Sequence, residues 1–181
     1  MEPELELTPA SEFPDSWILD ENPYHRAGHA ALEGKPMPPL VELSGWINGE
    51  VEPADLKGKV VIVELYTTAS WPSRRTFSLN NKLLKQYKDK GLMIVGVCTS
   101  SSGQEEMAAL AKEKGVEYPT ARDPTLKTKQ AWRAYYYPTY AVVDRKGIVR
   151  VVGLRPACLE KVVEKLLAEP APGDVALPNP K

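Results

Sequence analysis

Cysteine and histidine are scarce in this sequence, which has two of each among 181 residues. Cys98 and Cys158 are too few and too far apart in the chain to build a disulfide framework or a zinc site. His25 and His29 could offer two metal ligands from one helix face, but no clear third ligand accompanies them. We therefore expect neither a metal site nor a cofactor.

The sequence also has no large excess of one sign of charge and no long apolar run. The chain has 23 basic and 24 acidic side chains, for a formal net charge of -1. Such a balance gives no long-range field that would attract nucleic acid or an anionic membrane. No apolar run is long enough to cross a bilayer, and residues 1–10 have neither a basic start nor an apolar stretch. We expect no nucleic-acid partner and no membrane-spanning segment in this chain.

Proline, in contrast, is abundant and concentrated toward the two ends of the chain. This distribution predicts an N-terminal extension over residues 1–37, one domain over residues 38–169 and a proline-rich flexible tail over residues 170–181. The hydrophobic content of 43% is enough for that domain to bury a core.

Two local signals precede the main domain pattern. Residues 22–32 could form a short helix that ends at Gly34. The dipeptide Asn48-Gly49, between residues 41–47 and 50–51, is typical of a type I′ turn and predicts a β-hairpin.

The middle of the chain alternates strands and helices. The β-branched run at residues 60–66 predicts a strand that is buried on both faces. Ser70 can cap a helix over residues 71–88, and a second buried strand follows at residues 92–98, so the two strands should be parallel. Further helices are predicted over residues 104–114, 124–134 and 159–167, and a hairpin of two strands over residues 139–143 and 148–152.

This order of elements and three sequence segments resemble the thioredoxin-like superfamily. The segments are Leu-Lys-Gly-Lys-Val-Val at 56–61, Tyr-Thr-Thr-Ala-Ser-Trp-Pro-Ser-Arg-Arg at 66–75 and Tyr-Pro-Thr-Tyr-Ala-Val-Val-Asp-Arg-Lys-Gly at 137–147. They are similar to the TlpA/ResA-type thiol-disulfide oxidoreductases, which are close to the AhpC/TSA peroxiredoxins. The resemblance implies an α/β thioredoxin-like fold with a central mixed sheet flanked by helices, here with an N-terminal β-hairpin extension.

The resemblance also assigns the site residues. On the family pattern aromatic-x-x-x-Cys-x-x-Cys-Arg, Ser70 and Ser73 take the two catalytic cysteine positions, between Tyr66 and Arg74. Glu64 takes the position of the family's buried proton acceptor; the alternative is that it pairs with a lysine or reaches solvent at the strand end. The substrate-binding positions implied by the resemblance are Trp71, Pro72, Tyr137, Pro138 and Thr139, and Pro138 corresponds to the family's cis-proline.

Serine changes the expected chemistry of this site. Thiol-disulfide exchange needs a thiolate nucleophile and a mixed-disulfide intermediate, and a serine hydroxyl supplies neither. As written, the chain is therefore expected to be inactive in dithiol exchange. A hydrolytic role for Ser70 would need a base within reach, and the only histidines are His25 and His29 in the extension.

Two other functions stay open at this point. One is a peptide-binding or scaffold module without catalysis, in which Trp71 and the tyrosines at 135–137 anchor a partner. The other is a redox or peroxidase activity that uses Cys98 or Cys158, although Cys98 ends an apolar run and is expected to be buried.

The resemblance also has implications for the binding partner, for the origin of the two serines and for the cellular location. It implies a protein or peptide partner, which could carry a cysteine. The serines are explained either by replacement of the cysteine pair of a working oxidoreductase or by natural loss, and Ala69, where the family usually has tryptophan, favours loss. The family is typically extracytoplasmic, which implies a periplasmic protein whose signal or anchor is absent from this sequence; the alternative is a cytoplasmic protein.

Overall fold

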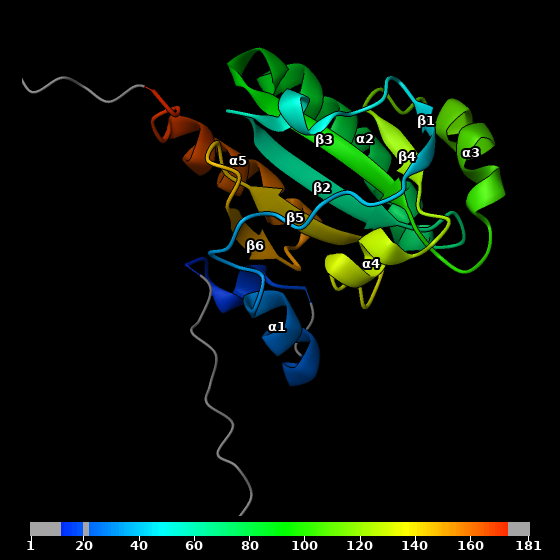
Figure 1. The fold of residues 1–181 in the computed structure, drawn as a ribbon, viewed down its shortest axis with the longest axis horizontal. Helices are drawn as coiled ribbons and strands as arrows, with labels where there is room; N and C mark the ends of the chain where they lie inside the picture. Colours follow the sequence, from blue (N-terminus) through cyan, green and yellow to red (C-terminus); the bar gives the residue numbers. More distant parts are fainter. Residues whose placement is uncertain (1–11, 20–21, 174–181) are drawn as a thin grey trace, which may run out of the picture.

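A six-stranded mixed sheet organises the residues that the structure, a computed structural model, describes, namely 12–19 and 22–173 (Figure 1). Most of the tail predicted over residues 170–181, and the beginning of the extension predicted over residues 1–37, lie outside the described residues. The strands are β1 (Ser44–Ile47), β2 (Val60–Tyr66), β3 (Leu92–Cys98), β4 (Thr120–Arg122), β5 (Thr139–Val143) and β6 (Val149–Val152), in the spatial order β1-β4-β3-β2-β5-β6.

The sheet is parallel in its centre and antiparallel toward both edges. Strand β3 is parallel to β2, as the strand, helix, strand order predicted, and it is also parallel to β4. Strand β5 runs antiparallel to β2, and the β5–β6 hairpin completes that side. The carboxyl end of β2 and the beginning of β5 therefore lie at the same end of the sheet, because Leu65 is paired with Thr139.

Helices cover the sheet on both faces. They are α1 (Pro23–Ala30), α2 (Trp71–Tyr87), α3 (Met107–Lys114), α4 (Lys127–Ala131) and α5 (Leu159–Ala168), with 3-10 turns at Asp15–Trp17, Pro53–Leu56, Lys88–Lys90, Gln104–Glu106 and Pro156–Cys158. Figure 1 shows α2 and α5 behind the sheet, and α4 with the chain leading to β1 in front of it. This arrangement confirms the α/β class and the central mixed sheet.

Strand β2 supplies both layers of the core because successive side chains point to opposite faces. Val60 and Ile62 pack on the face covered by α2 and α5, together with buried residues of those helices. Val61, Val63 and Leu65 pack on the other face, where Trp132 at the end of α4 is fully buried. All seven residues of β2 are buried, as predicted.

The predicted N-terminal hairpin is wrong. Asn48 and Gly49 do adopt positive φ angles, of 63° and 102°, as expected for the turn that this dipeptide predicted. However, β1 pairs antiparallel with β4, and residues 50–51 form no strand. The Asn48 side chain donates hydrogen bonds to the backbone oxygens of Val116 and Tyr118, at 2.7 and 3.1 Å, which holds the end of β1 beside the segment that leads into β4. A long-range pairing thus replaces the local one.

The helix predicted over residues 124–134 is shorter, and β4 was not predicted. The buried Asp123 carboxylate accepts hydrogen bonds from the backbone nitrogens of Thr128 and Lys129 and so fixes the start of α4. Leu126 and Arg133 flank the two ends of α4, and their φ angles of 58° and 53° are not helical.

The described part of the extension is packed against the edge of the sheet. Ile18 forms a β-bridge with Leu154, and Pro36 forms another with Ile148. Phe13 and Ile18 are buried in the same core as α2 and α5. The segment therefore contributes to the core, while the boundary placed at residues 37 and 38 stays a prediction.

Shortening Leu83 to alanine tests the role of α2 in this core. Leu83 is fully buried, so Leu83→Ala should lower the free energy of unfolding by about 3 kcal/mol through lost transfer energy and an unfilled cavity. The measurement is urea denaturation at neutral pH. The neighbouring Lys82→Ala, at an exposed position, should change the stability by about 0.5 kcal/mol or less. Equal effects of the two substitutions would contradict the packing described here.

Candidate functional site

The turn between β2 and α2 brings the first of the two serines against the loop that precedes β5. Ser70 is the N-cap of α2, and its hydroxyl oxygen accepts a hydrogen bond from the Ser73 nitrogen at 3.3 Å. The same hydroxyl donates to the backbone oxygen of Tyr137 at 3.4 Å. The peptide between Tyr137 and Pro138 is cis, as the resemblance implied. The predicted cap is confirmed, and the Ser70 hydroxyl lies beside the loop that carries the cis-proline.

Ser73 lies one turn further along α2 and is fully buried. Its hydroxyl has no hydrogen-bond partner among the residues that the structure describes. An unsatisfied buried hydroxyl costs about 1–3 kcal/mol, whereas a thiol is only a weak donor and behaves as a small apolar group. The surroundings of position 73 are therefore better suited to sulfur than to oxygen.

Glu64 lies behind this turn, in the centre of β2, and is fully buried. Its two carboxyl oxygens accept hydrogen bonds from four uncharged side chains: Thr76 Oγ1 at 2.8 Å, Asn80 Nδ2 at 2.9 Å, Tyr118 OH at 2.8 Å and Tyr140 OH at 2.9 Å. The alternatives of a lysine partner or a solvent-exposed position are wrong, because the carboxyl group is enclosed by neutral donors.

The sheet order explains how these donors reach Glu64. Tyr140 is its direct neighbour on β5, and Gly96 is its neighbour on β3. Tyr118 precedes β4, so its ring must pass over β3 to reach the carboxyl group. A Cβ atom at Gly96 would lie 3.1 Å from the Tyr118 ring and 2.7 Å from the Thr120 hydroxyl. The glycine in this strand thus makes room for a side chain that crosses it.

Burial has a large effect on the proton affinity of this carboxyl group. Removal from water raises the pKa of Glu64 from the ordinary 4.5 to about 7, although the hydrogen bonds from Tyr118, Thr76, Tyr140 and Asn80 favour the ionised form. Burial also raises the pKa of the Tyr118 and Tyr140 hydroxyls well above the ordinary value, so both stay neutral donors. Glu64 is therefore the group of this cluster that can change its charge near neutral pH.

Two of the donors can adjust to either state of Glu64. The Tyr140 hydroxyl can donate to Glu64 or to Asn80 Oδ1, which lies at 3.0 Å, and the Thr76 hydroxyl can donate to Glu64 or to the Ser73 backbone oxygen at 2.8 Å. A hydroxyl has only one proton to donate. When Glu64 is protonated, it can donate to one of these hydroxyls, which then turns to its second acceptor. The hydrogen-bond network thus accommodates both protonation states.

A groove of about 630 Å³ adjoins the turn on its outer side. It is lined by Leu19, Trp71, Pro72, Arg75, Thr76, Tyr136, Tyr137, Pro138 and Pro156. Four of the five predicted substrate-binding residues are in this set. The fifth, Thr139, is fully buried, and its hydroxyl donates to the backbone oxygen of Tyr136, so it supports the loop from behind. The Trp71 side chain is 68% exposed, which leaves a large aromatic surface at the rim.

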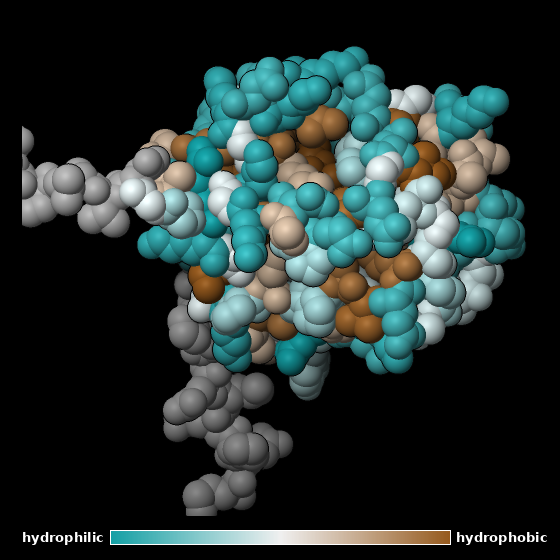
Figure 2. Space-filling view, turned by 45° about the horizontal axis from the view of Figure 1, so that its top comes forward, coloured by the Kyte–Doolittle hydropathy of each residue, from teal (hydrophilic) through white to brown (hydrophobic). Residues whose placement is uncertain are grey.

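Apolar side chains reach the surface in hollows elsewhere on the molecule too. Figure 2 shows such hydrophobic patches set among hydrophilic side chains. Within residues 12–19 and 22–173, no helix has the length and apolar character needed to cross a membrane.

The cysteines and histidines do not join the turn. Cys98 is fully buried, and burial raises the pKa of its thiol to about 12, so it is a poor nucleophile. Cys158 is half-buried, and both thiols are free. The His25 ring stacks on Tyr135 with centroids 4.5 Å apart, and His29 Nε2 lies 2.9 Å from the backbone oxygen of Arg133.

The hydrogen bonds of Ser70 therefore go to backbone groups and not to either histidine, which leaves the hydrolytic alternative without a base. In the described part of the chain, no group of three or more histidine, cysteine or acidic residues is placed to hold a metal ion.

Sequence reasoning missed the donors around Glu64, although two signals for them were present. Helix α2 turns a stripe of residues toward the core, including Phe77, Leu83 and Tyr87, and the polar residues Thr76 and Asn80 lie on the same buried stripe. Polar side chains at core positions indicate an internal partner, because an unpaired buried polar group is costly. The glycine inside the apolar run of β3 was a second signal.

Replacing Glu64 with glutamine tests its protonation behaviour. Below about pH 4.5 the carboxyl group is protonated in both the folded and the unfolded chain. As the pH rises toward 7, only the unfolded chain loses this proton, so the free energy of unfolding falls by about 3 kcal/mol in total. Glu64→Gln resembles the protonated side chain and should remove this loss. Urea denaturation between pH 5 and pH 8 measures it. Parallel stability profiles for the two proteins would show that Glu64 has an ordinary pKa.

Comparisons with known proteins agree with this geometry. Residues 34–152 match the model of the AhpC/TSA family. The chain is 31% identical over 154 residues to the protein DipZ of Mycobacterium bovis, an alignment that covers 79% of this chain and 22% of DipZ, so the chain spans about a fifth of that relative. It is 28% identical over 143 residues to the thiol-disulfide oxidoreductase YkuV of Bacillus subtilis, covering 75% of this chain and 96% of YkuV.

A solved structure gives the same result for the fold. The thiol:disulfide interchange protein of the thioredoxin family from Chlorobium tepidum superimposes with a TM-score of 0.62 at 25% identity, covering 75% of this chain and 99% of that one. The family match extends from the end of the extension through β6, and it contains the serine turn, Glu64 and the cis-proline loop. The chain therefore belongs to the AhpC/TSA family and has the fold of the thioredoxin-like thiol-disulfide oxidoreductases.

Proposed function

We propose that this chain is a thioredoxin-like domain that binds a protein or peptide segment and does not carry out dithiol exchange. The observation that carries the proposal is the position of the Ser70 hydroxyl, which caps α2 and lies 3.4 Å from the backbone oxygen of Tyr137. In the family pattern this is the position of the nucleophilic sulfur.

The chemistry of oxygen supports the absence of exchange. The N-terminus of a helix lowers the pKa of a cysteine thiol enough to yield a thiolate, but a serine hydroxyl is far too weakly acidic for the same effect. Oxygen at positions 70 and 73 also cannot enter the mixed disulfide through which exchange proceeds. Of the two cysteines, Cys98 is enclosed in the core and Cys158 has no second thiol beside it in sequence, so neither replaces the missing pair.

The rest of the site supports a domain that has kept the framework of the exchange reaction. Glu64 keeps a raised pKa near 7 and a network that accepts both of its protonation states. In the family pattern this position holds a buried proton acceptor. Without a thiol at this turn, the buried Glu64 costs stability, and so does the Ser73 hydroxyl, which has no partner among the described residues.

The groove beside Trp71 supports a peptide partner. Its lining combines exposed aromatic surface with the rigid rings of Pro72, Pro138 and Pro156. Aromatic side chains in such a groove are typical anchors for an extended segment, because they bury a large area at small entropic cost. The resemblance to the ResA branch also supports an extracytoplasmic location for this domain.

Restoring both cysteines tests whether serine alone silences the site. The unchanged protein should reduce insulin no faster than the uncatalysed background, while Ser70→Cys/Ser73→Cys should give turnover at least about tenfold above background, because the helix N-terminus can then activate a thiol. The assay is insulin precipitation with dithiothreitol as the reductant.

The single variant Ser70→Cys is the matched control, since it has the nucleophile without a resolving thiol and should stay near background. Turnover by the unchanged protein would refute the absence of exchange. A double variant that is folded but inactive would instead refute the retention of the framework.

Truncating Trp71 tests the peptide groove. Insulin B chain with carboxymethylated cysteines should bind the unchanged protein in isothermal titration calorimetry, and Trp71→Ala should weaken that binding about tenfold through loss of the exposed aromatic anchor. Tyr24→Ala removes another exposed aromatic side chain, 79% exposed, which does not line the groove, and should leave the affinity unchanged. No titratable binding by the unchanged protein, or equal effects of both substitutions, would contradict the assignment.

A further inference from the structure

A second and larger cavity lies at the opposite end of the sheet from the serine turn. Its volume is about 900 Å³. Val61 at the beginning of β2 and Val143 at the end of β5 form its floor, and these two residues are directly paired in the sheet. The serine turn follows the other end of β2, so the cavity is separate from the groove beside Trp71.

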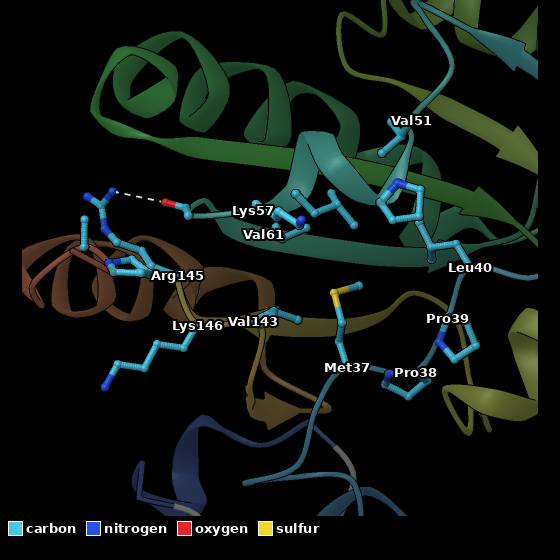
Figure 3. A pocket seen from close by; sticks show the side chains of 16 residues that line it. Met37, Pro38, Pro39, Leu40, Val51, Lys57, Val61, Val143, Arg145 and Lys146 are labelled. Carbon is cyan, nitrogen blue, oxygen red and sulfur yellow. Dashed lines mark hydrogen bonds between the residues drawn. The ribbon is translucent and has the colours of Figure 1, made fainter.

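The walls of this cavity are aliphatic. Met37 and Leu40 come from the chain that crosses in front of the sheet, and Val51 and Leu56 come from the segment between β1 and β2 (Figure 3). No aromatic side chain lines it among the described residues. A cavity of this size with mostly apolar walls is typical of a site for a small ligand, and the absence of aromatic rings favours a flexible aliphatic chain over a flat ring system.

All charged side chains that line the cavity are basic. They are Lys57, Arg145 and Lys146, and no described aspartate or glutamate lines the cavity with them. Figure 3 shows Arg145 and Lys146 toward one end, with Lys57 nearer the centre, whereas Val51, Leu40 and Pro39 lie toward the other end. The cavity is therefore polarised, with positive charge on one side and aliphatic surface on the other.

The three basic side chains differ in whether they already form hydrogen bonds or ion pairs within the protein. Arg145 donates hydrogen bonds to the backbone oxygens of Gly58, Lys90 and Leu167, so its guanidinium group holds three segments together. Lys57 and Lys146 are exposed, and neither forms an ion pair within the described part of the chain. These two ammonium groups are available to a ligand.

We propose that this cavity binds a single-chain amphiphile with a carboxylate head group, of the kind that a fatty acid presents. The aliphatic chain lies against Met37, Leu40 and Val61, where burial of its methylene groups stabilises the complex. The carboxylate lies near Lys57 and Lys146, which recognise it by charge. The occupant is a free molecule and not a membrane surface, because the aliphatic residues line a recessed cavity between segments of the chain.

Isothermal titration calorimetry of the full chain with dodecanoate, below its micellar concentration, tests this proposal. Dodecanoate should bind with one-to-one stoichiometry, and dodecyltrimethylammonium, which has the same chain and the opposite charge, should bind at least about tenfold more weakly. Lys57→Glu should weaken dodecanoate binding by about fivefold to tenfold. Lys59→Glu is the matched control, because Lys59 is exposed, lies two residues away and does not line the cavity; it should have less than about a twofold effect.

Four results would overturn the proposal. Equal binding of the two amphiphiles, or equal effects of the two lysine substitutions, would remove the role of charge. Binding to vesicles of anionic phospholipid without binding of monomeric dodecanoate would indicate a membrane surface. Dodecanoate binding that appears only after deletion of residues 174–181, which follow the lining residues Ala171 and Pro172, would indicate that the chain itself occupies the cavity.

Discussion

The interaction on which the site depends is the enclosure of one carboxyl group, that of Glu64, by four uncharged donors at the centre of the sheet. Thr76 and Asn80 fix the face of α2 that packs on the sheet, Tyr140 comes from the neighbouring strand β5, and Tyr118 reaches across β3 from the segment before β4. Each of these side chains would be costly to bury alone. Together they stabilise one register of helix and sheet, and that register determines where the turn after β2 ends.

The same enclosure sets the chemical character of the turn. A carboxyl group whose pKa is near 7 can take up or release a proton at physiological pH, and it lies behind a helix N-terminus that favours negative charge. The chain offers hydroxyl groups there, and one of them, on Ser73, has no partner among the described residues. The arrangement is therefore that of a proton acceptor without an acid matched to it.

Sequence patterns predicted the parts of the fold that depend on neighbouring residues. The β-branched run of β2 and the serine cap of α2 are local signals, and the corresponding elements begin where those signals placed them. The partner of β1, the three-residue strand β4 and the donors of Glu64 depend on contacts between residues far apart in the chain. Asn48-Gly49 is instructive, because its backbone has the positive φ angles of the predicted turn while its strand pairs elsewhere. The cavity above Val61 is likewise formed by segments that no local pattern brings together.

The bridge between Ile18 and Leu154 has a consequence for the groove beside Trp71. It fastens the start of the described chain beside the segment after β6, and Leu19 and Pro156 from these two segments form part of the groove next to Trp71. Both residues lie outside the stretch that matches the family model, residues 34–152. The part of the groove that these flanking segments form therefore lies outside the family match, whereas the serine turn and Glu64 lie within it.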